Sequence, residues 1–325
     1  MKFESIQLTC LSKERHSLIN IQPIPLRVIF VFPANEIYLG STVLRLKQVA
    51  EYVRMIPGCE ISVQPIEKVN FESLSNAILV FTKVGLRHIR SDTFIVLRAN
   101  GNVVILDELD GERSLSSQAD YVLRPKLFEK NLSAFDIKKI LPVSTLPDRR
   151  LRSRKNINKP NLSFSCVYVG SKSKYLFSQT KVRGPLQRKY ISPYTWLGAT
   201  PPVWSRNLNK YNFHLVASPF ESYDEIPKTL TKFSTSLLLN ALPIVGAWET
   251  HLDPYLAGDY PYKLLEGSTK SLLNQMLDFQ RSFSYDVYDY LINDLKAKNQ
   301  KLLCEVNFIM EWHLALSRIK HERFL

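Results

Sequence analysis

The sequence predicts an α/β protein with two domains, each built on a parallel sheet, and three observations support this prediction. The chain has 325 residues, more than a typical single domain contains. Short β-branched and aromatic runs alternate with segments of helical spacing, as in strands joined by crossover helices. Residues 142–162 interrupt this alternation with three prolines and a basic run, after which it starts again.

The N-terminal half opens with RVIFVF at residues 27–32, a continuous apolar run that is typical of a buried parallel strand. Ser41 is placed to cap a helix over residues 42–56, where apolar residues recur at helical spacing until Pro57 and Gly58. Further strands are expected at residues 60–64, 77–82, 103–106, 121–123 and 139–141, and an acidic loop follows the third of these.

The C-terminal half starts with a strand at residues 163–170, and residues 171–210 are expected to be mostly loop with short helices. The elements expected after it are a strand at 213–217, a helix at 232–241, a strand at 243–245, a helix at 249–257, a strand at 262–265, a helix capped by Ser268 and a helical tail. The predicted division is 1–150 for the N-terminal domain, 151–283 for the C-terminal domain and 284–325 for the C-terminal helices.

Composition restricts the class of protein and its partners. The net charge of +13 attracts polyanions, whether nucleic acid, anionic lipid or a diphosphate-bearing substrate. No apolar run approaches the roughly 20 residues of a membrane span, and the first residues lack a signal-peptide pattern. We therefore expect a cytoplasmic protein, at most peripheral at the inner face of a membrane. The four cysteines are widely spaced, so we expect free thiols and no metal site.

Residues 213–246 form the segment with the clearest functional pattern, a strand, a loop, a helix and a strand. In open parallel sheets, ligands bind beyond the carboxyl ends of strands, where helix N-termini expose N–H groups. Thr231 offers a hydroxyl there, and Lys228 and Lys232 are spaced to share one side of a helical turn. A diphosphate suits such a corner. The alternative, that both lysines are ordinary surface charges, stays open at this point.

Three sequence segments carry a resemblance to a known family: PKTLTK at 227–232, NALPIVG at 240–246 and ETHLDPYLAGDYPY at 249–262. They resemble the nucleotide-sugar-binding domain of GT-B-type glycosyltransferases of bacteria and viruses. The resemblance implies two Rossmann-like domains facing a cleft, with C-terminal helices crossing back to the first domain. It implies that Thr231 and Lys232 contact the donor phosphates, that Gly246 leaves room for the donor, and that Glu249 bonds donor hydroxyls.

The chain departs from the commoner retaining enzymes of this family at one motif. Those enzymes carry two glutamates separated by seven residues, and the matching positions here are Lys228 and Ser236. The sugar and the stereochemical outcome therefore stay open.

The N-terminal half is similar to the first strand, loop and helix of the same family. The similar segments are RVIFVFP, LGS at 39–41, TVLRLKQVA at 42–50 and VVILDELDG at 103–111. Gly40 permits close backbone approach and Ser41 opens the helix, so both are expected on the acceptor side. A GxGxxG fingerprint is absent from this turn, which argues against a dehydrogenase. The resemblance extends over residues 27–110 and 163–280.

The implied activity is a hexosyltransferase-like glycosyl transfer from a nucleotide-sugar co-substrate to a glycan, polysaccharide or lipid-linked acceptor, without a metal or other cofactor. Lys232, Lys228 and Arg183 are the candidates for stabilising the departing diphosphate. An inverting reaction also needs a general base, and the carboxylates at predicted strand ends of the N-terminal half are Glu36, Asp107, Glu108 and Asp110. Glu36 is preferred because its loop would face the cleft. Asp107 and Asp110 could be taken for a metal-binding pair, but acids at strand ends are usually solvated or cap the next element.

One of two histidines and two other functions stay open as alternatives. His214 is expected to be packed within a strand, while His251 lies closer to the site and stays an alternative there. A non-enzymatic nucleic-acid-binding protein would fit the charge, but no such motif is present, so nucleic acid is not an expected partner. Another GT-B-fold enzyme, such as a nucleotide-sugar epimerase, is the second alternative. An anionic membrane surface is a further candidate partner.

Overall fold

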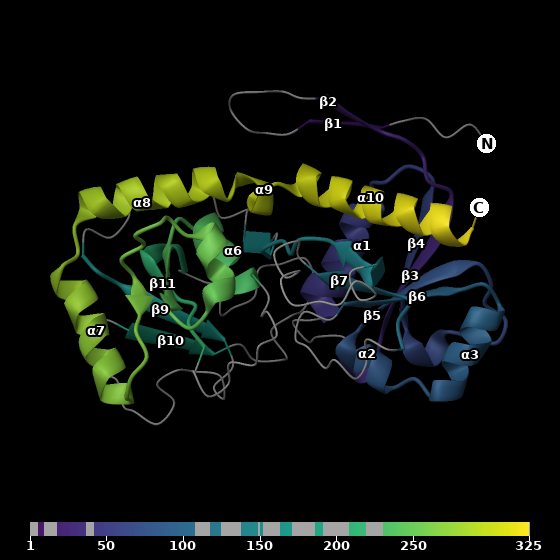
Figure 1. Ribbon diagram of the computed structural model, residues 1–325, viewed down its shortest axis with the longest axis horizontal. Coiled ribbons are helices and arrows are strands. Elements are labelled where there is room, and N and C mark those ends of the chain that lie inside the picture. The colour runs from purple at the N-terminus through teal and green to yellow at the C-terminus, as the bar shows by residue number, and fades with distance from the viewer. Residues whose placement is uncertain are drawn as a thin grey trace. The chain divides into compact units, whose positions relative to one another are not determined.

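Two parallel sheets organise the chain in a computed structural model, each within its own compact unit (Figure 1). The structure describes residues 6–9, 18–36, 42–107, 118–124, 138–148, 150–151, 163–170, 186–190, 208–218 and 230–324. The first unit comprises Met1–Leu146, Pro227–Thr229 and Cys304–Leu325, and the second comprises Pro147–Ile226 and Leu230–Leu303. The predicted α/β class is confirmed.

The first unit contains a six-stranded sheet in the order β4-β3-β5-β6-β7-β8, and every neighbouring pair is parallel. The strands are β3 (Leu26–Phe32), β4 (Cys59–Pro65), β5 (Ala77–Thr82), β6 (Val103–Asp107), β7 (Tyr121–Arg124) and β8 (Ile140–Pro142). Each strand predicted in this half is present, and no strand end differs from the prediction by more than one residue. An antiparallel hairpin, β1 (Ile6–Thr9) and β2 (Leu18–Ile21), precedes them and was not predicted.

Helices cover both faces of this sheet, which explains why its central strands are apolar at nearly every position. Val28 and Phe30 belong to a core that includes residues of α1 (Gln48–Val53) and α10 (Glu305–Arg323). Ile29 and Val31 point to the opposite core, which α2 (Lys83–Arg87) and α3 (Ser91–Ala99) complete. Figure 1 shows the two pairs of helices on opposite sides of the strands. A strand buried on both faces reads as a continuous hydrophobic run.

The helix predicted at residues 42–56 differs from the prediction in form and length. It begins as the π-helix η2 (Thr42–Lys47), continues as α1 and ends at Val53. Short 3₁₀ segments, η1 (Ala34–Glu36) and η3 (Ile66–Lys68), follow β3 and β4. π-Helices are rare, and they occur frequently at functional sites.

The second unit contains a parallel sheet in the order β10-β9-β11-β12-β13. Its strands are β9 (Cys166–Gly170), β10 (Leu186–Tyr190), β11 (Phe213–Leu215), β12 (Leu242–Gly246) and β13 (Lys263–Leu264). The prediction that residues 171–210 would be mostly loop was wrong at β10, whose sequence LQRKY has no apolar run. Because β10 lies at the edge of the sheet, its polar residues are compatible with a strand there.

The helices of the second unit are η9 (Leu208–Lys210), α6 (Thr231–Leu238), η11 (Thr250–Tyr255), α7 (Thr269–Arg281), α8 (Tyr285–Lys298) and α9 (Gln300–Leu303). α6 packs against β12 and α8. The segment predicted as a helix over 249–257 is the 3₁₀ helix η11, which contains Pro254, a residue that an α-helix interior disfavours. Ser268 caps α7 as predicted, since its hydroxyl accepts a hydrogen bond from the Ser271 N–H.

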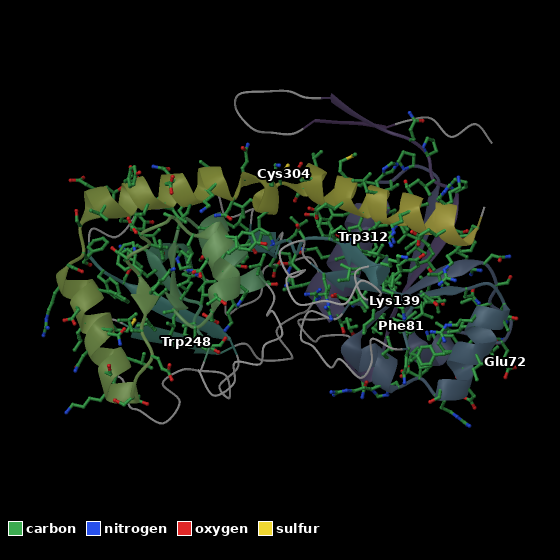
Figure 2. All side chains as sticks on the ribbon, in the orientation of Figure 1. Glu72, Phe81, Lys139, Trp248, Cys304 and Trp312 are labelled. Carbon is green, nitrogen blue, oxygen red and sulfur yellow. The ribbon has the colours of Figure 1, made fainter. Side chains whose placement is uncertain are left out.

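The last helix, α10, returns the chain to the first unit, while α8 and α9 belong to the second. Trp312 of α10 is buried against Phe30 of β3, with ring centroids 5.8 Å apart (Figure 2). The Tyr121 hydroxyl of β7 donates a 2.5 Å hydrogen bond to Glu322, and Arg323 lies over the same ring. The prediction that C-terminal helices cross back to the first domain is confirmed through α10.

Candidate functional site

The carboxyl-terminal edge of the second sheet contains a topological switch point. The chain leaves β9 toward β10 on one side and leaves β11, through α6, toward β12 on the other. Open α/β sheets bind their ligands in the crevice at such a point. The geometry of the residues at this edge therefore decides what the second unit can bind.

Lys232 lies at this switch point. It belongs to the first turn of α6, and its ammonium nitrogen is 4.7 Å from the ring centroid of Tyr168, a fully buried residue of β9. A cation over an aromatic face is attracted by the ring quadrupole. This contact holds the ammonium group beside β9, one of the two strands that flank the switch point. Lys232 is half-buried.

Thr231 is the first residue of the same helix and is also half-buried. Leu230, at the N-cap position, has no side-chain oxygen, and the first turn contains no acidic residue. The positive end of α6 is therefore not neutralised from within its own first turn, an arrangement that favours anions.

Glu249 ties together the ends of the two neighbouring strands. It is 3% exposed, and its Oε1 accepts a hydrogen bond of 3.2 Å from the Ser218 N–H beyond β11. Its Oε2 accepts one of 3.0 Å from the Gly246 N–H at the end of β12. Hydrogen bonds to a buried carboxylate are among the strong ones. The acid predicted to bond donor hydroxyls thus also fixes the edge of the sheet.

Trp248 completes this edge of the sheet (Figure 2). Its indole N–H donates a 3.1 Å hydrogen bond to the Ser218 carbonyl, and its ring lies so close to Gly246 that a Cβ at that position would overlap it. Gly246 is therefore required for the packing of Trp248, in addition to any room it leaves for a ligand. Trp248, Ser218 and Tyr168 were not predicted from the sequence. Of these, only Trp248 had a signal, its position just beyond a predicted strand.

The structure brings four predicted site residues to this edge, namely Thr231, Lys232, Gly246 and Glu249. Four others lie outside the described residues, namely Lys228, Arg183 and the acceptor-side pair Gly40 and Ser41. Glu36 ends η1, and its side chain also lies outside the described part of the chain. Ser236, which occupies one glutamate position of the commoner enzymes, is fully buried and donates its hydroxyl to the Phe233 carbonyl at 2.7 Å.

Asp107 lies at the corresponding carboxyl edge of the first sheet, where it is the last residue of β6. Its carboxylate forms a bidentate ion pair with Arg45 of η2, through the guanidinium Nε and Nη2. The Asp107 side chain is only 2% exposed. The acid predicted as a candidate base is therefore engaged with a cation inside the first unit.

His214 is buried in β11, as expected, and it faces away from the aromatic core of the second sheet. Burial lowers its pKa from 6.5 to about 4, and a hydrogen bond with the Leu208 backbone opposes this effect. His251 lies in η11 and is half-buried.

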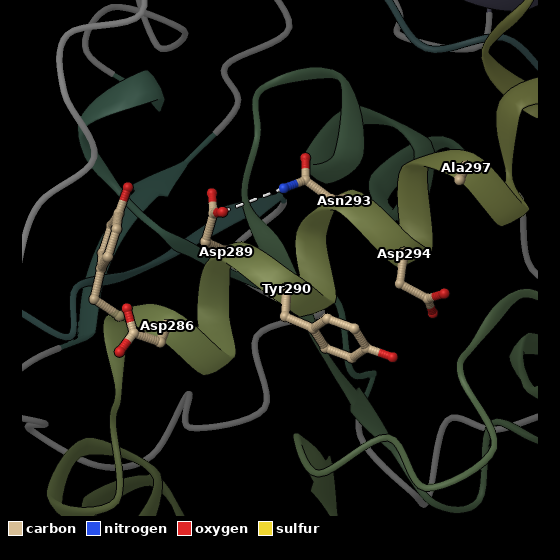
Figure 3. Close-up of a pocket in the computed structure, with 7 residues that line it drawn as sticks. Asp286, Asp289, Tyr290, Asn293, Asp294 and Ala297 are labelled. Atoms are coloured by element: carbon tan, nitrogen blue, oxygen red, sulfur yellow. Dashed lines mark hydrogen bonds between the residues drawn. The ribbon is translucent and has the colours of Figure 1, made fainter.

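A separate hollow of about 650 Å³ lies along the outer side of α8 (Figure 3). Asp286, Asp289 and Asp294 line it together with Tyr285 and Tyr290. Three carboxylates repel a diphosphate, so this hollow does not suit a nucleotide-sugar donor. Within the described residues, no group of three or more metal-binding side chains is close enough to hold an ion.

Comparison with known proteins supports the fold. No family model matches the sequence, and no curated protein matches it. The crystal structure of an alpha1,3-fucosyltransferase is similar, with a TM-score of 0.50 and 11% identity, over 93% of this chain and 91% of that one. At such low identity the similarity shows the fold alone. The chain thus has the GT-B-like fold predicted from its sequence. No helix in the described part of the chain is long and apolar enough to cross a membrane.

Proposed function

We propose that this protein is a glycosyltransferase that moves a sugar from a nucleotide-sugar donor to a glycan, polysaccharide or lipid-linked acceptor without a metal. One observation carries the proposal: Lys232, in the first turn of α6, lies over Tyr168 at the switch point of the second sheet. The fold shared with a fucosyltransferase supports the reaction class.

The donor diphosphate is the group that this edge suits best. Its charge grows as the glycosidic bond breaks, and fixed cations and helix N-termini stabilise such a developing charge. Lys232 supplies the cation, and Thr231 supplies a hydroxyl hydrogen bond. We propose Lys228 and Arg183 as further cations for the same group.

Glu249 and Gly246 shape the sugar side of the proposed site. The Glu249 carboxylate accepts hydrogen bonds from the backbone amides of Ser218 and Gly246. We propose that it also accepts hydrogen bonds from donor hydroxyls, since an ionised carboxylate is an acceptor only. In this proposal Glu249 both stabilises the strand ends and recognises the donor.

The acceptor side of the proposal lies in the first unit. Glu36 is the proposed general base, with Gly40 and Ser41 beside the acceptor. Because Arg45 engages Asp107 in a bidentate pair, we assign Asp107 the role of positioning that arginine rather than of removing the acceptor proton.

Nucleotide-sugar binding is the direct test. The purified protein is titrated with UDP-, GDP-, CMP- and ADP-sugars, beginning with nucleotide-activated fucose because of the structural similarity. We expect one of them to raise the melting temperature, and Lys232→Ala to abolish the shift. The matched control is Lys270→Ala, which removes an exposed lysine of α7 and leaves binding intact.

Two results would contradict the proposal. If no nucleotide sugar binds at millimolar concentration, the transferase function fails. If the protein instead binds oligonucleotides in a salt-dependent manner, the nucleic-acid-binding alternative is favoured. An epimerase would bind the nucleotide sugar and convert it without an acceptor, so the products distinguish it.

The net charge of +13 supports one further part of the proposal, a cytoplasmic location beside an anionic membrane that presents the acceptor. Sedimentation with vesicles of neutral and anionic lipid tests it. Binding to anionic vesicles that disappears at high salt is expected, and equal sedimentation with neutral vesicles contradicts it.

A further inference from the structure

The first sheet has its own switch point, occupied by the π-helix η2. In the strand order β4-β3-β5, the chain leaves β3 through η2 and α1 to reach β4, while β5 lies on the other side of β3. η2 contacts both β3 and β5. This is the position at which open α/β sheets bind ligands. Polar groups of η2 that lack a hydrogen-bond partner are therefore candidates for binding one.

Arg45 of η2 is held in one orientation by Asp107. The Nε and Nη2 atoms of its guanidinium donate to the two carboxylate oxygens. The third nitrogen, Nη1, is buried and has no hydrogen-bond partner among the described residues. A guanidinium has donors only, so Nη1 can be satisfied only by an acceptor that is not one of the described side chains or carbonyls.

Thr42 has a second buried polar atom without a hydrogen-bond partner. The residue is 1% exposed, and its hydroxyl oxygen has no partner in the part of the chain that the structure describes. Thr42 and Arg45 are three residues apart and lie within one turn of the π-helix. Native proteins seldom leave buried polar groups unsatisfied, and each such group calls for a ligand or a bound water.

We propose that Arg45 and Thr42 form a binding site for an oxyanion, a carboxylate, sulfate or phosphate group of a ligand. The Arg45 Nη1 and the Thr42 hydroxyl donate hydrogen bonds to its oxygens, and Asp107 is the positioning residue that orients the guanidinium. The site stands on the first unit alone. Only the assignment of its ligand, an acceptor substrate that carries an acidic group, rests on the proposed transferase function.

The chain contains a matched control for Thr42. Thr145 belongs to the same unit, is 8% exposed, and its hydroxyl oxygen is likewise buried with no partner among the described residues. It follows β8, four strands from β3 in the sheet, whereas Thr42 lies against β3 and β5. Replacing either threonine with valine keeps the branched shape and removes one unsatisfied hydroxyl, so neither change is expected to reduce stability.

The test uses the full-length Lys232→Ala protein, so that anions do not report on the proposed donor corner. Inorganic phosphate and acetate are titrated by calorimetry into this parent, into the parent with Thr42→Val and into the parent with Thr145→Val. We expect the parent and the Thr145 variant to bind alike. Thr42→Val should weaken binding about 10- to 150-fold, the ratio for a hydrogen bond of 1.5–3 kcal/mol to a charged group.

Two results overturn the inference. If neither anion binds the parent, the two donors of η2 hold at most a water molecule. If the Thr42 and Thr145 variants bind equally well, any anion lies elsewhere. Both results leave the transferase function in place, because that function is read from nucleotide-sugar binding to the protein with Lys232 intact.

Discussion

Acid should destabilise the second unit through His214, and the size of the effect follows from its environment. The imidazole is 4% exposed in β11, and no described group partners its Nε2. Burial disfavours the charged form and lowers the pKa of His214 to about 4, while the unfolded chain keeps a value near 6.5. The unfolded state therefore binds the additional proton first as the pH falls.

The sign and magnitude come from this difference in proton binding. The contribution to stability is complete above pH 6.5 and is lost progressively as the pH falls toward 4. For pKa values of 6.5 and about 4, the free energy of unfolding falls by about 2 kcal/mol between pH 8 and pH 5, and by about 3 kcal/mol at pH 4. Since β11 leads to the Ser218 end of the proposed donor site, acid should weaken donor binding as well.

Urea unfolding at a series of pH values measures this effect. His214→Asn removes the titrating ring and keeps an N–H donor for the Leu208 backbone. The variant should lose the wild-type decrease of about 2 kcal/mol between pH 8 and pH 5, whatever its stability at neutral pH. His88→Asn, at an exposed histidine in the first unit, is the matched control and should keep that decrease. Parallel curves for the wild type and His214→Asn would refute the reasoning.

Three other changes test the described contacts. Gly246→Ala forces the ring of Trp248 to move and should cost about 1–3 kcal/mol in urea unfolding, whereas Gly258→Ala, where the added methyl meets nothing within 4 Å, should cost about 0.5 kcal/mol or less. Glu249→Gln replaces one carboxylate oxygen with an NH₂ group, so one of the two backbone N–H groups loses its acceptor. Hydrogen exchange at the two strand ends should rise, and the free energy of unfolding should fall by about 1–3 kcal/mol. Tyr121→Phe removes a hydrogen bond to α10 and should cost about 1 kcal/mol, and unchanged protection of α10 amides would contradict it.

The sequence predicted the central strands well because burial on both faces leaves a direct signal. β3 and β5 are apolar at nearly every position, since one set of side chains meets α1 and α10 while the other meets α2 and α3. β10 lacked that signal because it lies at an edge and carries charged residues. Position in the sheet, which no local pattern records, thus decided which strands could be predicted.

The candidate site was predictable to a smaller extent, because its contacts join distant residues. The position of Lys232 at a helix start could be inferred from neighbouring residues, but Tyr168, on which its ammonium group lies, is far away in the chain. Arg45 and Asp107 are likewise 62 residues apart, and nothing in either segment indicates the ion pair. Spacing along a helix or strand is visible in a sequence, whereas pairing across a sheet edge is not.

The acids at the two sheet edges show what this limit means for function. Asp107 ends β6 and Glu249 lies just beyond β12, and the sequence offered each as a candidate for contacting a substrate. In the structure, a guanidinium holds the first and two backbone amides hold the second. Lys232 and Arg45 are the cationic groups at the same two edges, and we propose that they donate hydrogen bonds to the ligand. Both proposed sites therefore favour anionic ligands, which is the preference that a chain of net charge +13 should have.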